Sequence, residues 1–217
     1  MELPTYSLIC KKASKIAKNI PSLPRSKSHI VILDASGLKV YGEGEWKRKI
    51  HGRGRPRKWV KLHIAIDKDI QDILANITTT SNTADITQTK PLLDEIRGKT
   101  KIVLADGAYD GERKEFEKRG IKGLVPPSRN AKYRKSDNER DRAILEIQGL
   151  GGGERARSLW GKLTGYNYRV LAETAFSRMK RLFGERLFSR KFDKQQIENM
   201  LRCQLINKIN TFDNVEN

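Results

Sequence analysis

Runs of apolar residues bounded by turn residues predict a series of strands along the first half of the chain. Residues 30–33 and 102–105 are uninterrupted apolar runs, which are typical of strands buried on both faces of a sheet. Residues 59–66 alternate between apolar and polar side chains, and residues 73–80 are rich in β-branched ones, so both predict strands. A last short strand is predicted at 121–125, where two prolines follow.

Helical patterns lie between and after these strands. Helices are predicted at 85–96, 111–119, 168–183 and 193–212. Thr83 or Asp85 is suited to cap the first of them. Strands first and alternating units afterwards favour an α/β fold, a mixed sheet with helices on both faces. A ribonuclease-H-like sheet has this order of elements.

The remaining segments divide the chain. A weakly helical patch at 6–20 precedes a Pro/Ser/Lys stretch, and the polar, Gly-rich segment at 128–165 holds one further helical pattern at 137–147. The expected divisions are an N-terminal remnant and linker at 1–28, a main domain at 29–212 with an insert at about 128–165, and a tail at 213–217. The insert lies directly before the helix expected at 168–183.

Charge narrows the classes of partner. The 217 residues include 44 Lys and Arg against 26 Asp and Glu, a formal net charge of +18. A field of this sign attracts polyanions, of which nucleic acids are the commonest. No apolar run reaches the roughly 18 residues of a membrane helix, and no basic segment precedes an apolar signal region. We therefore expect a soluble, intracellular protein with no membrane partner.

Cysteine and histidine do not form a metal-binding pattern. Cys10 and Cys203 lie near opposite ends of the chain, and no C-x-x-C occurs. None of the three histidines is near a cysteine. A structural zinc site is not expected, and both cysteines are interpreted as small apolar residues.

Two carboxylates follow the two apolar runs. Asp34 comes directly after residues 30–33, and Asp106 directly after residues 102–105. Ligands of open α/β sheets bind beyond the carboxyl ends of strands, so neighbouring strands would bring Asp34 and Asp106 together. The alternative is an ordinary turn at each position, since a glycine follows both aspartates closely.

A third carboxylate lies on the helix predicted at 168–183. At about 100° per residue, Arg169, Glu173 and Lys180 lie within about 40° of one another on one face. The alternative is a solvated face with an Arg–Glu pair at i, i+4, which stabilises a helix by only a few tenths of a kcal/mol.

These residues resemble a known family. The spacing Tyr166-x2-Arg169-x3-Glu173-x6-Lys180 is similar at every position to the Y-x2-R-x3-E-x6-K signature of DDE transposases from bacterial insertion sequences of types four and five. Residues 33–46 and 104–110 resemble the motifs around that family's first and second Asp. The resemblance runs from about 29 to 209. Ala35 departs from it, because a polar residue often stands there, but the three carboxylates remain.

The resemblance implies a two-metal phosphoryl transfer. In such a reaction two divalent ions, about 3.5–4 Å apart, stabilise the attacking and leaving oxygens. Hard oxygen ligands suit Mg²⁺, or Mn²⁺ in its place. Asp34 would bridge both ions, with Asp106 on one and Glu173 on the other. Arg169 and Lys180 would contact phosphates near the metals, and Tyr166 would serve as a positioning group.

The implied partners are the transposon ends and the target, both double-stranded DNA, with self-association of the protein on DNA. The implied location is the bacterial cytoplasm, on the nucleoid when DNA is bound. Two rival functions stay open: a nuclease with the same triad that never joins strands, and a non-enzymatic DNA-binding protein. The first would cut but not join, and the second would bind DNA equally well without Asp34.

A basic stretch supplies candidate DNA contacts. These are Lys47, Arg48, Lys49, Arg53, Arg55, Arg57 and Lys58. Arg-Gly-Arg-Pro at 53–56 is the core of an AT-hook, which enters A·T-rich minor grooves. The alternative is a basic loop that touches phosphates without reading bases. Trp46 and Trp59 could stack on a flipped base, but core packing is the expected role of both.

The first catalytic strand is expected at residue 30, so only residues 1–28 precede the domain. Members of the resembled family generally carry a separate helical DNA-binding domain there. One predicted helix cannot bury its own apolar face. We therefore expect that this chain lacks most of the end-recognition domain and does not transpose efficiently alone.

Overall fold

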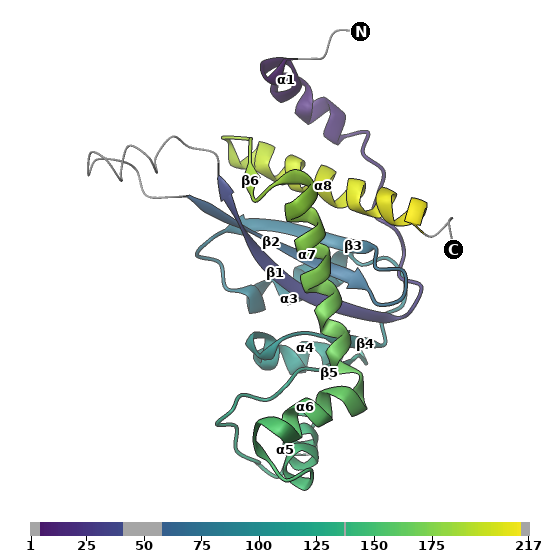
Figure 1. The fold of residues 1–217 in the computed structure, drawn as a ribbon, viewed down its shortest axis with the longest axis vertical. Helices are drawn as coiled ribbons and strands as arrows, with labels where there is room; N and C mark the ends of the chain where they lie inside the picture. Colours follow the sequence, from purple (N-terminus) through teal and green to yellow (C-terminus); the bar gives the residue numbers. More distant parts are fainter. Residues whose placement is uncertain (1–4, 41–57, 137, 214–217) are drawn as a thin grey trace, which may run out of the picture.

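The computed structural model describes residues 5–40, 58–136 and 138–213. One mixed sheet lies at its centre, with the strand order β3-β2-β1-β4-β5 and with β6 paired to β1 (Figure 1). The strands are β1 (Ile30–Val40), β2 (Trp59–Asp67), β3 (Ile73–Thr80), β4 (Ile102–Leu104), β5 (Lys122–Leu124) and β6 (Arg186–Leu187). The first three strands form antiparallel pairs, whereas β4 and β6 run parallel to β1, and β5 to β4.

The central strand β1 is longer than its apolar run predicts. It pairs with β4 only over Ile30–Ile32, but its register with β2 continues from Val31 to Lys39. Asp34 therefore lies inside the strand, opposite Ile64, and the expectation that the strand ends before it is wrong, as is the turn alternative. The hydrogen bonds to β2 carry the strand past the point where its apolar side chains stop.

Three of the described α-helices, α3, α4 and α7, begin with a 3-10 turn that the pattern did not predict. The helical elements are α1 (Tyr6–Ala17), η1 (Asp85–Gln88), α3 (Thr89–Glu95), η2 (Gly107–Glu112), α4 (Arg113–Lys118), α5 (Glu139–Gly149), α6 (Gly153–Thr164), η3 (Tyr166–Arg169), α7 (Val170–Phe183) and α8 (Phe192–Asp213). Neither Thr83 nor Asp85 is the N-cap of η1: Ala84 holds that position, without a side-chain cap bond.

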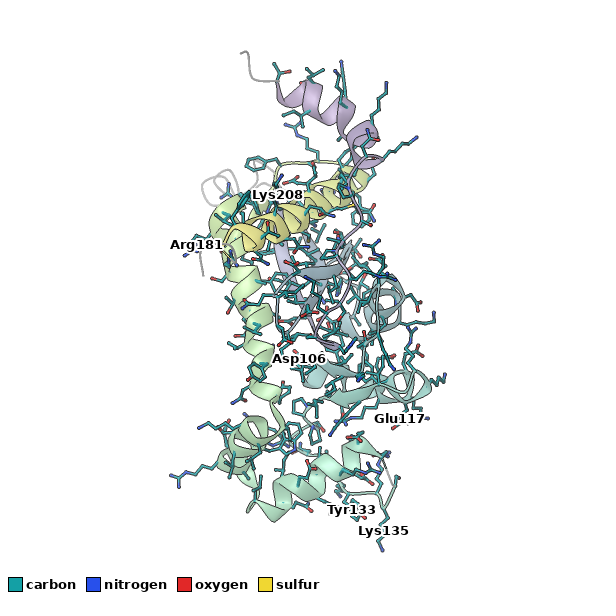
Figure 2. All side chains as sticks on the ribbon, turned by 90° about the vertical axis from the view of Figure 1, so that its right-hand side faces the viewer. Asp106, Glu117, Tyr133, Lys135, Arg181 and Lys208 are labelled. Atoms are coloured by element: carbon teal, nitrogen blue, oxygen red, sulfur yellow. The ribbon has the colours of Figure 1, made fainter. Side chains whose placement is uncertain are left out.

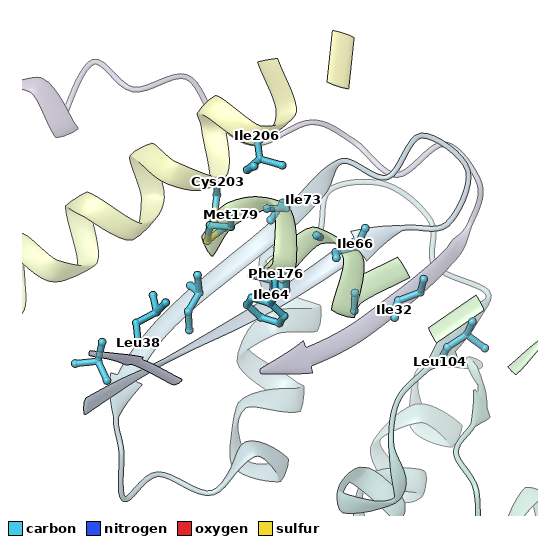
Figure 3. Close-up of a cluster of buried hydrophobic side chains, with 14 of the residues drawn as sticks. Ile32, Leu38, Ile64, Ile66, Ile73, Leu104, Phe176, Met179, Cys203 and Ile206 are labelled. Carbon is cyan, nitrogen blue, oxygen red and sulfur yellow. The ribbon is translucent and has the colours of Figure 1, made fainter. Parts of the chain in front are cut away.

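The sheet has a hydrophobic core on each face. Even-numbered residues of β1, such as Ile32 and Leu38, pack with Phe176 and Met179 of α7 and with Cys203 of α8 (Figure 3). Odd-numbered residues point to the other face, as strand alternation requires. There Val31, Leu33 and Ala65 pack with side chains of α3, η2 and α4, among them Leu92, Tyr109 and Phe116. The predicted mixed sheet with helices on both faces is confirmed.

The insert before α7 is a pair of helices with a small core of its own. Ala143 and Ile147 of α5 pack against Ala156 and Trp160 of α6, and Trp160 Nε1 donates to Glu146 Oε2 over 2.6 Å. The helix expected at 137–147 matches α5, whereas α6 was not predicted. Its glycine-rich start concealed it, since Gly is a poor helix former.

The structure also bears on the expectations for the cysteines, the tryptophans and membrane helices. Cys203 is buried and free, as expected. Trp59 is 38% exposed and lies with its ring 5.7 Å from Lys39 Nζ, so its expected place in the core is wrong. The strand β6 was not predicted. Within the described residues, no helix is both long and apolar enough to cross a membrane.

Candidate active site

Asp34 lies on β1 beyond Ile32, the last residue of that strand that pairs with β4. Its side chain points to the same face as Ile32 and Leu38, toward α7, because it has the same parity along the strand. The carboxylate is 15% exposed, and its Oδ1 accepts from the backbone N–H of Ala35 over 2.9 Å. The sheet thus presents a half-buried carboxylate beside a helix.

Asp106 lies two residues beyond the end of the neighbouring parallel strand β4. It is the N-cap of η2, and its Oδ1 accepts from Ala108 N over 2.8 Å. Parallel neighbours end on the same side of a sheet, so this position brings Asp106 toward Asp34. Figure 2 shows Asp106 near the middle of the molecule, far from Tyr133 and Lys135 at one end and from Arg181 and Lys208 toward the other.

The pKa of Asp34 is affected by both of the other carboxylates. Burial raises the pKa of Asp34 most, and the negative charges of Asp106 and Glu173 raise it further. The backbone N–H of Ala35 and the cation of Arg169 act in the opposite direction. The net shift is upward, so Asp34 bears a charge that its surroundings disfavour.

Arg169 joins two of the carboxylates. Its Nη1 lies 3.5 Å from Asp34 Oδ2, and its Nη2 donates to Oε1 of Glu173, which is 54% exposed. Arg169 ends η3 rather than lying inside the long helix, and α7 begins at Val170. The i, i+4 ion pair that sequence reasoning offered as a surface feature is present, and the same guanidinium also reaches the strand.

A cleft of about 450 Å³ opens between the middle of β1 and α7. It is lined by Asp34, Ala35, Ser36, Glu173, Phe176, Ser177, Lys180 and Glu185. Asp34, Glu173 and Lys180 thus line one cleft, whereas Asp106 is not among its lining residues. Helical spacing predicted only that Glu173 and Lys180 share a face. It also contains Glu185, which sequence reasoning did not select and which accepts from Lys39 over 2.7 Å.

Tyr166 connects the site to the insert. Its ring lies 5.7 Å from the ring of Trp160, and its exposure is intermediate. Burial raises the pKa of Tyr166, although the cation of Arg169 opposes this effect. The phenol therefore lies beside Arg169 at the junction between α6 and η3.

The carboxylates of the site bear on whether it could hold a metal ion. In the part of the chain that is described, no group of three or more His, Cys, Asp or Glu is gathered closely enough to hold an ion. The chemistry of the donor set nevertheless fits a hard divalent ion, because the carboxylates of Asp34 and Glu173 line one cleft and the charge of Asp106 also acts on Asp34. Arg169 already places one cation between Asp34 and Glu173.

The basic stretch falls almost wholly outside the described residues. This holds for Lys47, Arg48, Lys49, Arg53, Arg55, Arg57 and Trp46, and so for the AT-hook interpretation. Lys58 is described and exposed, directly before β2.

Sequence reasoning missed three polar residues behind the site. His63, Asp85 and Tyr109 lie on β2, η1 and η2, and the side chains of His63 and Tyr109 are almost completely buried. A signal was available for two of them: Tyr109 is part of the motif around Asp106, and His63 interrupts an apolar strand.

Comparison with known proteins gives one family. Residues 25–208 match the model of the family described as "Transposase DDE domain". Among solved structures, the chain is similar to one described as a "Cryo-EM structure of piggyBac transposase synaptic complex with hairpin DNA", with 9% identity and a TM-score of 0.48. The alignment covers 96% of this chain and 52% of that one, so the chain spans about half the length of that transposase.

Proposed function

This chain belongs to the transposase DDE domain family, and we propose that it cuts and joins DNA strands during transposition of a bacterial insertion sequence. One observation carries the proposal. Arg169 contacts both Asp34 of β1 and Glu173 of α7, and the negative charges of Glu173 and of Asp106, the N-cap of η2, both raise the pKa of Asp34. A solvated surface pair would involve neighbours on one helix only.

We propose that the fold is ribonuclease-H-like. The strand order β3-β2-β1-β4-β5, with three antiparallel strands followed by two parallel ones, supports this. The proposed catalytic domain spans 29–212 and contains the insert at about 128–165, where α5 and α6 lie. Residues 1–28 and 213–217 are proposed to lie outside it.

We propose that Asp34, Asp106 and Glu173 hold two divalent ions, Mg²⁺ or Mn²⁺. When bound, such ions polarise the scissile phosphate and stabilise the attacking and leaving oxygens. The surroundings of Asp34 favour a cation there, because its charge is partly desolvated and repelled by two further carboxylates. The protein itself supplies no nucleophile in this proposal: water and then a DNA 3′-OH attack the phosphorus.

The cations of the site are proposed to bind DNA phosphates. Lys180 lines the cleft beside Asp34 and Glu173, and Arg169 reaches both carboxylates from the end of η3. A planar guanidinium is suited to hold a phosphate oxygen in a fixed orientation. Tyr166 packs on Trp160 and lies beside Arg169, so it is proposed to set the direction in which that guanidinium points.

Double-stranded DNA is the proposed partner, both as transposon ends and as target, together with self-association of the protein on DNA. The net charge of +18 supports a polyanionic partner. The basic residues proposed for this contact are Lys47, Arg48, Lys49, Arg53, Arg55, Arg57 and Lys58.

A joining assay tests the proposed function. The substrates are an oligonucleotide with the element's own end, carrying a free 3′-OH, and a supercoiled plasmid. With Mg²⁺ or Mn²⁺, the labelled end is expected to become covalently attached to the plasmid. With chelator or with Ca²⁺, which accepts looser coordination, no product is expected. Nicking without attachment would show a nuclease, and binding without either would show a non-enzymatic protein.

A further inference from the structure

Two buried polar side chains with unpaired atoms lie on the sheet face opposite Asp34. His63 pairs with Ala35 in the register of β1 and β2, and its side chain has no exposed surface. Tyr109 in η2 is 1% exposed. Among the described residues, His63 Nδ1 and the Tyr109 hydroxyl are buried without a hydrogen-bond partner. A buried polar group without a partner loses the hydrogen bonds it would make to water, so two in one place call for a physical reason.

Asp85 lies beside His63 Nδ1, and the element that Asp85 begins packs against η2, which carries Tyr109. Its Oδ1 lies 3.6 Å from His63 Nδ1 and accepts from Lys61 Nζ over 3.0 Å. After burial, Asp85 is the largest cause that raises the pKa of Tyr109, ahead of Asp34 and Asp106. Asp85 begins η1, which packs so closely on η2 that a Cβ at Gly111 would lie 2.7 Å from Ile86 Cδ1.

We propose that Asp85 accepts hydrogen bonds from His63 Nδ1–H and from the Tyr109 hydroxyl, and that these three residues position the carboxylates of Asp106 and Asp34. The proposal rests on the function proposed above and adds a supporting layer to the same site. None of the three side chains lines the cleft, so they are positioning residues rather than catalytic ones.

The connection to Asp106 is short. Tyr109 N donates to the backbone oxygen of Asp106 over 3.1 Å, and the Asp106 side chain caps the same turn through Ala108 N. A fixed Tyr109 ring therefore fixes the turn that holds the Asp106 carboxylate. His63 lies beside Ala35, the neighbour of Asp34, so the same cluster reaches the strand that carries the other carboxylate.

The tautomer of His63 follows from its two neighbours. Burial, although opposed by the charge of Asp85, lowers the pKa of His63 to about 4, so the ring is neutral and has one N–H at pH 7. The hydroxyl of Thr79 lies 2.8 Å from Nε2 and 3.2 Å from the carbonyl oxygen of Thr80, and in this proposal it donates its proton to the nearer Nε2. Nδ1 faces a carboxylate, which only accepts. The proton therefore belongs on Nδ1.

Nuclear magnetic resonance of the imidazole nitrogens tests the cluster without any metal or DNA. In the wild-type chain, Nδ1 of His63 is expected to carry the proton. Asp85→Asn is expected to shift the resonances of both ring nitrogens of His63. It is also expected to shift the amide resonance of Ala108, which is far from Asp85 in sequence. Asp94→Asn removes an exposed carboxylate bonded to Lys90 and Arg119 and is the matched control. An unprotonated Nδ1, or unchanged ring signals in Asp85→Asn, would overturn the proposal.

Metal affinity tests the positioning role. Tyr109→Phe keeps the packed ring and removes only the hydroxyl, and Tyr133→Phe does the same at an exposed ring. Loss of a group that orients a metal ligand typically costs 10–100-fold in metal affinity or activity. We expect a loss of this size in Mn²⁺ affinity, measured by electron paramagnetic resonance, for Tyr109→Phe alone, with a melting temperature close to wild type. Affinity within twofold of wild type would contradict the role.

The two proposals fail in different ways. A wild-type chain that binds no Mn²⁺ and joins no DNA contradicts the proposed function. The His63 spectrum then shows independently whether Asp85 accepts the proposed hydrogen bond from His63. A wild-type chain that binds Mn²⁺ normally, while Tyr109→Phe and Asp85→Asn bind it equally well, leaves the function standing and overturns the positioning role.

Discussion

At the scale of the residue, the site combines carboxylates that differ in exposure. The side chain of Asp34 is 15% exposed and that of Glu173 is 54% exposed, yet one guanidinium contacts both. Asp34 is held by the strand and by the N–H of Ala35, whereas Glu173 is held by helix α7 and by Arg169. Each carboxylate is thus kept in place by its own element before any ligand binds.

Single isosteric substitutions of these carboxylates are predicted to abolish DNA cleavage. Asp34→Asn, Asp106→Asn and Glu173→Gln each keep the side-chain shape, so circular dichroism and DNA affinity should stay close to wild type. Removal of one ligand should slow cleavage by at least a thousandfold, about 4 kcal/mol. Glu185→Gln is the matched control, because Glu185 lines the same cleft. A rate within tenfold of wild type in any of the three would remove that residue from the site.

A fourth carboxylate, Asp67, has a structural role at the far end of β2. Its Oδ2 accepts from Ser26 Oγ and from the amides of Lys27 and Ser28, and its Oδ1 accepts from Asp69 N. Burial acts to raise the pKa of Asp67, but these N–H donors outweigh it and the pKa is lowered. The charged form is therefore favoured by folding, and its stabilisation is complete above the unfolded pKa of about 3.9.

This stabilisation should disappear as pH falls through the lowered pKa of the folded state. Asp67→Asn turns an N–H group toward these donors, so it is predicted to lower the free energy of unfolding at pH 7 by about 1–3 kcal/mol. The difference from wild type should shrink on acidification below about pH 4. Urea unfolding at several pH values measures both, with the exposed Asp69→Asn as control. A difference that does not change with pH would show that the charge is not responsible.

At the scale of the element, the long segments were predictable and their ends were not. The strands β2 and β3 and the helices α7 and α8 follow from periodicity, because each has a side-chain pattern that repeats over many residues. The extension of β1 past Leu33 was not predictable, since it depends on hydrogen bonds to β2 rather than on apolar side chains. The two-residue strand β6 depends likewise on the edge that β1 exposes beyond β4.

Some parts of the candidate site were likewise predictable from the sequence and others were not. The apolar runs at 30–33 and 102–105 singled out Asp34 and Asp106, although β1 continues past Asp34. The shared face of Glu173 and Lys180 follows from helical spacing. The double contact of Arg169 was not predictable, because it requires the distance between η3 and β1. The roles of His63 and Asp85 also depend on which side chains the sheet and η1 bring together.

The insert is predicted to unfold separately from the sheet. Its core is a small cluster around Trp160, apart from the two cores that cover the sheet. Trp160→Ala should lower the free energy of unfolding by about 3–5 kcal/mol. The loss of stability should be confined mainly to α5 and α6. Hydrogen exchange should then be faster in those helices while β1 and β2 stay protected. Equal loss of protection throughout would show that the insert and the sheet fold as one unit.

At the scale of the whole molecule, charge is predicted to dominate DNA affinity. With 44 basic and 26 acidic residues, binding should weaken steeply with salt, by a log–log slope of about −0.9 for each phosphate contacted. Combined neutralisation of Arg53, Arg55 and Arg57 should flatten the slope and weaken binding to all sequences alike. Filter binding on A·T-rich and G·C-rich duplexes checks this. An unchanged slope with loss of A·T preference would favour the AT-hook interpretation.

The central claim is that one divalent-ion site is built from β1, η2 and α7. Backbone cleavage by Fe²⁺ bound in place of Mg²⁺ tests it directly, because the hydroxyl radicals formed with ascorbate and peroxide cut the chain beside the ion. Mass spectrometry of the fragments should place the cuts next to residues 34, 106 and 173, and excess Mg²⁺ should suppress all three together. Cuts at other positions, or cuts that Mg²⁺ does not suppress, would contradict the account.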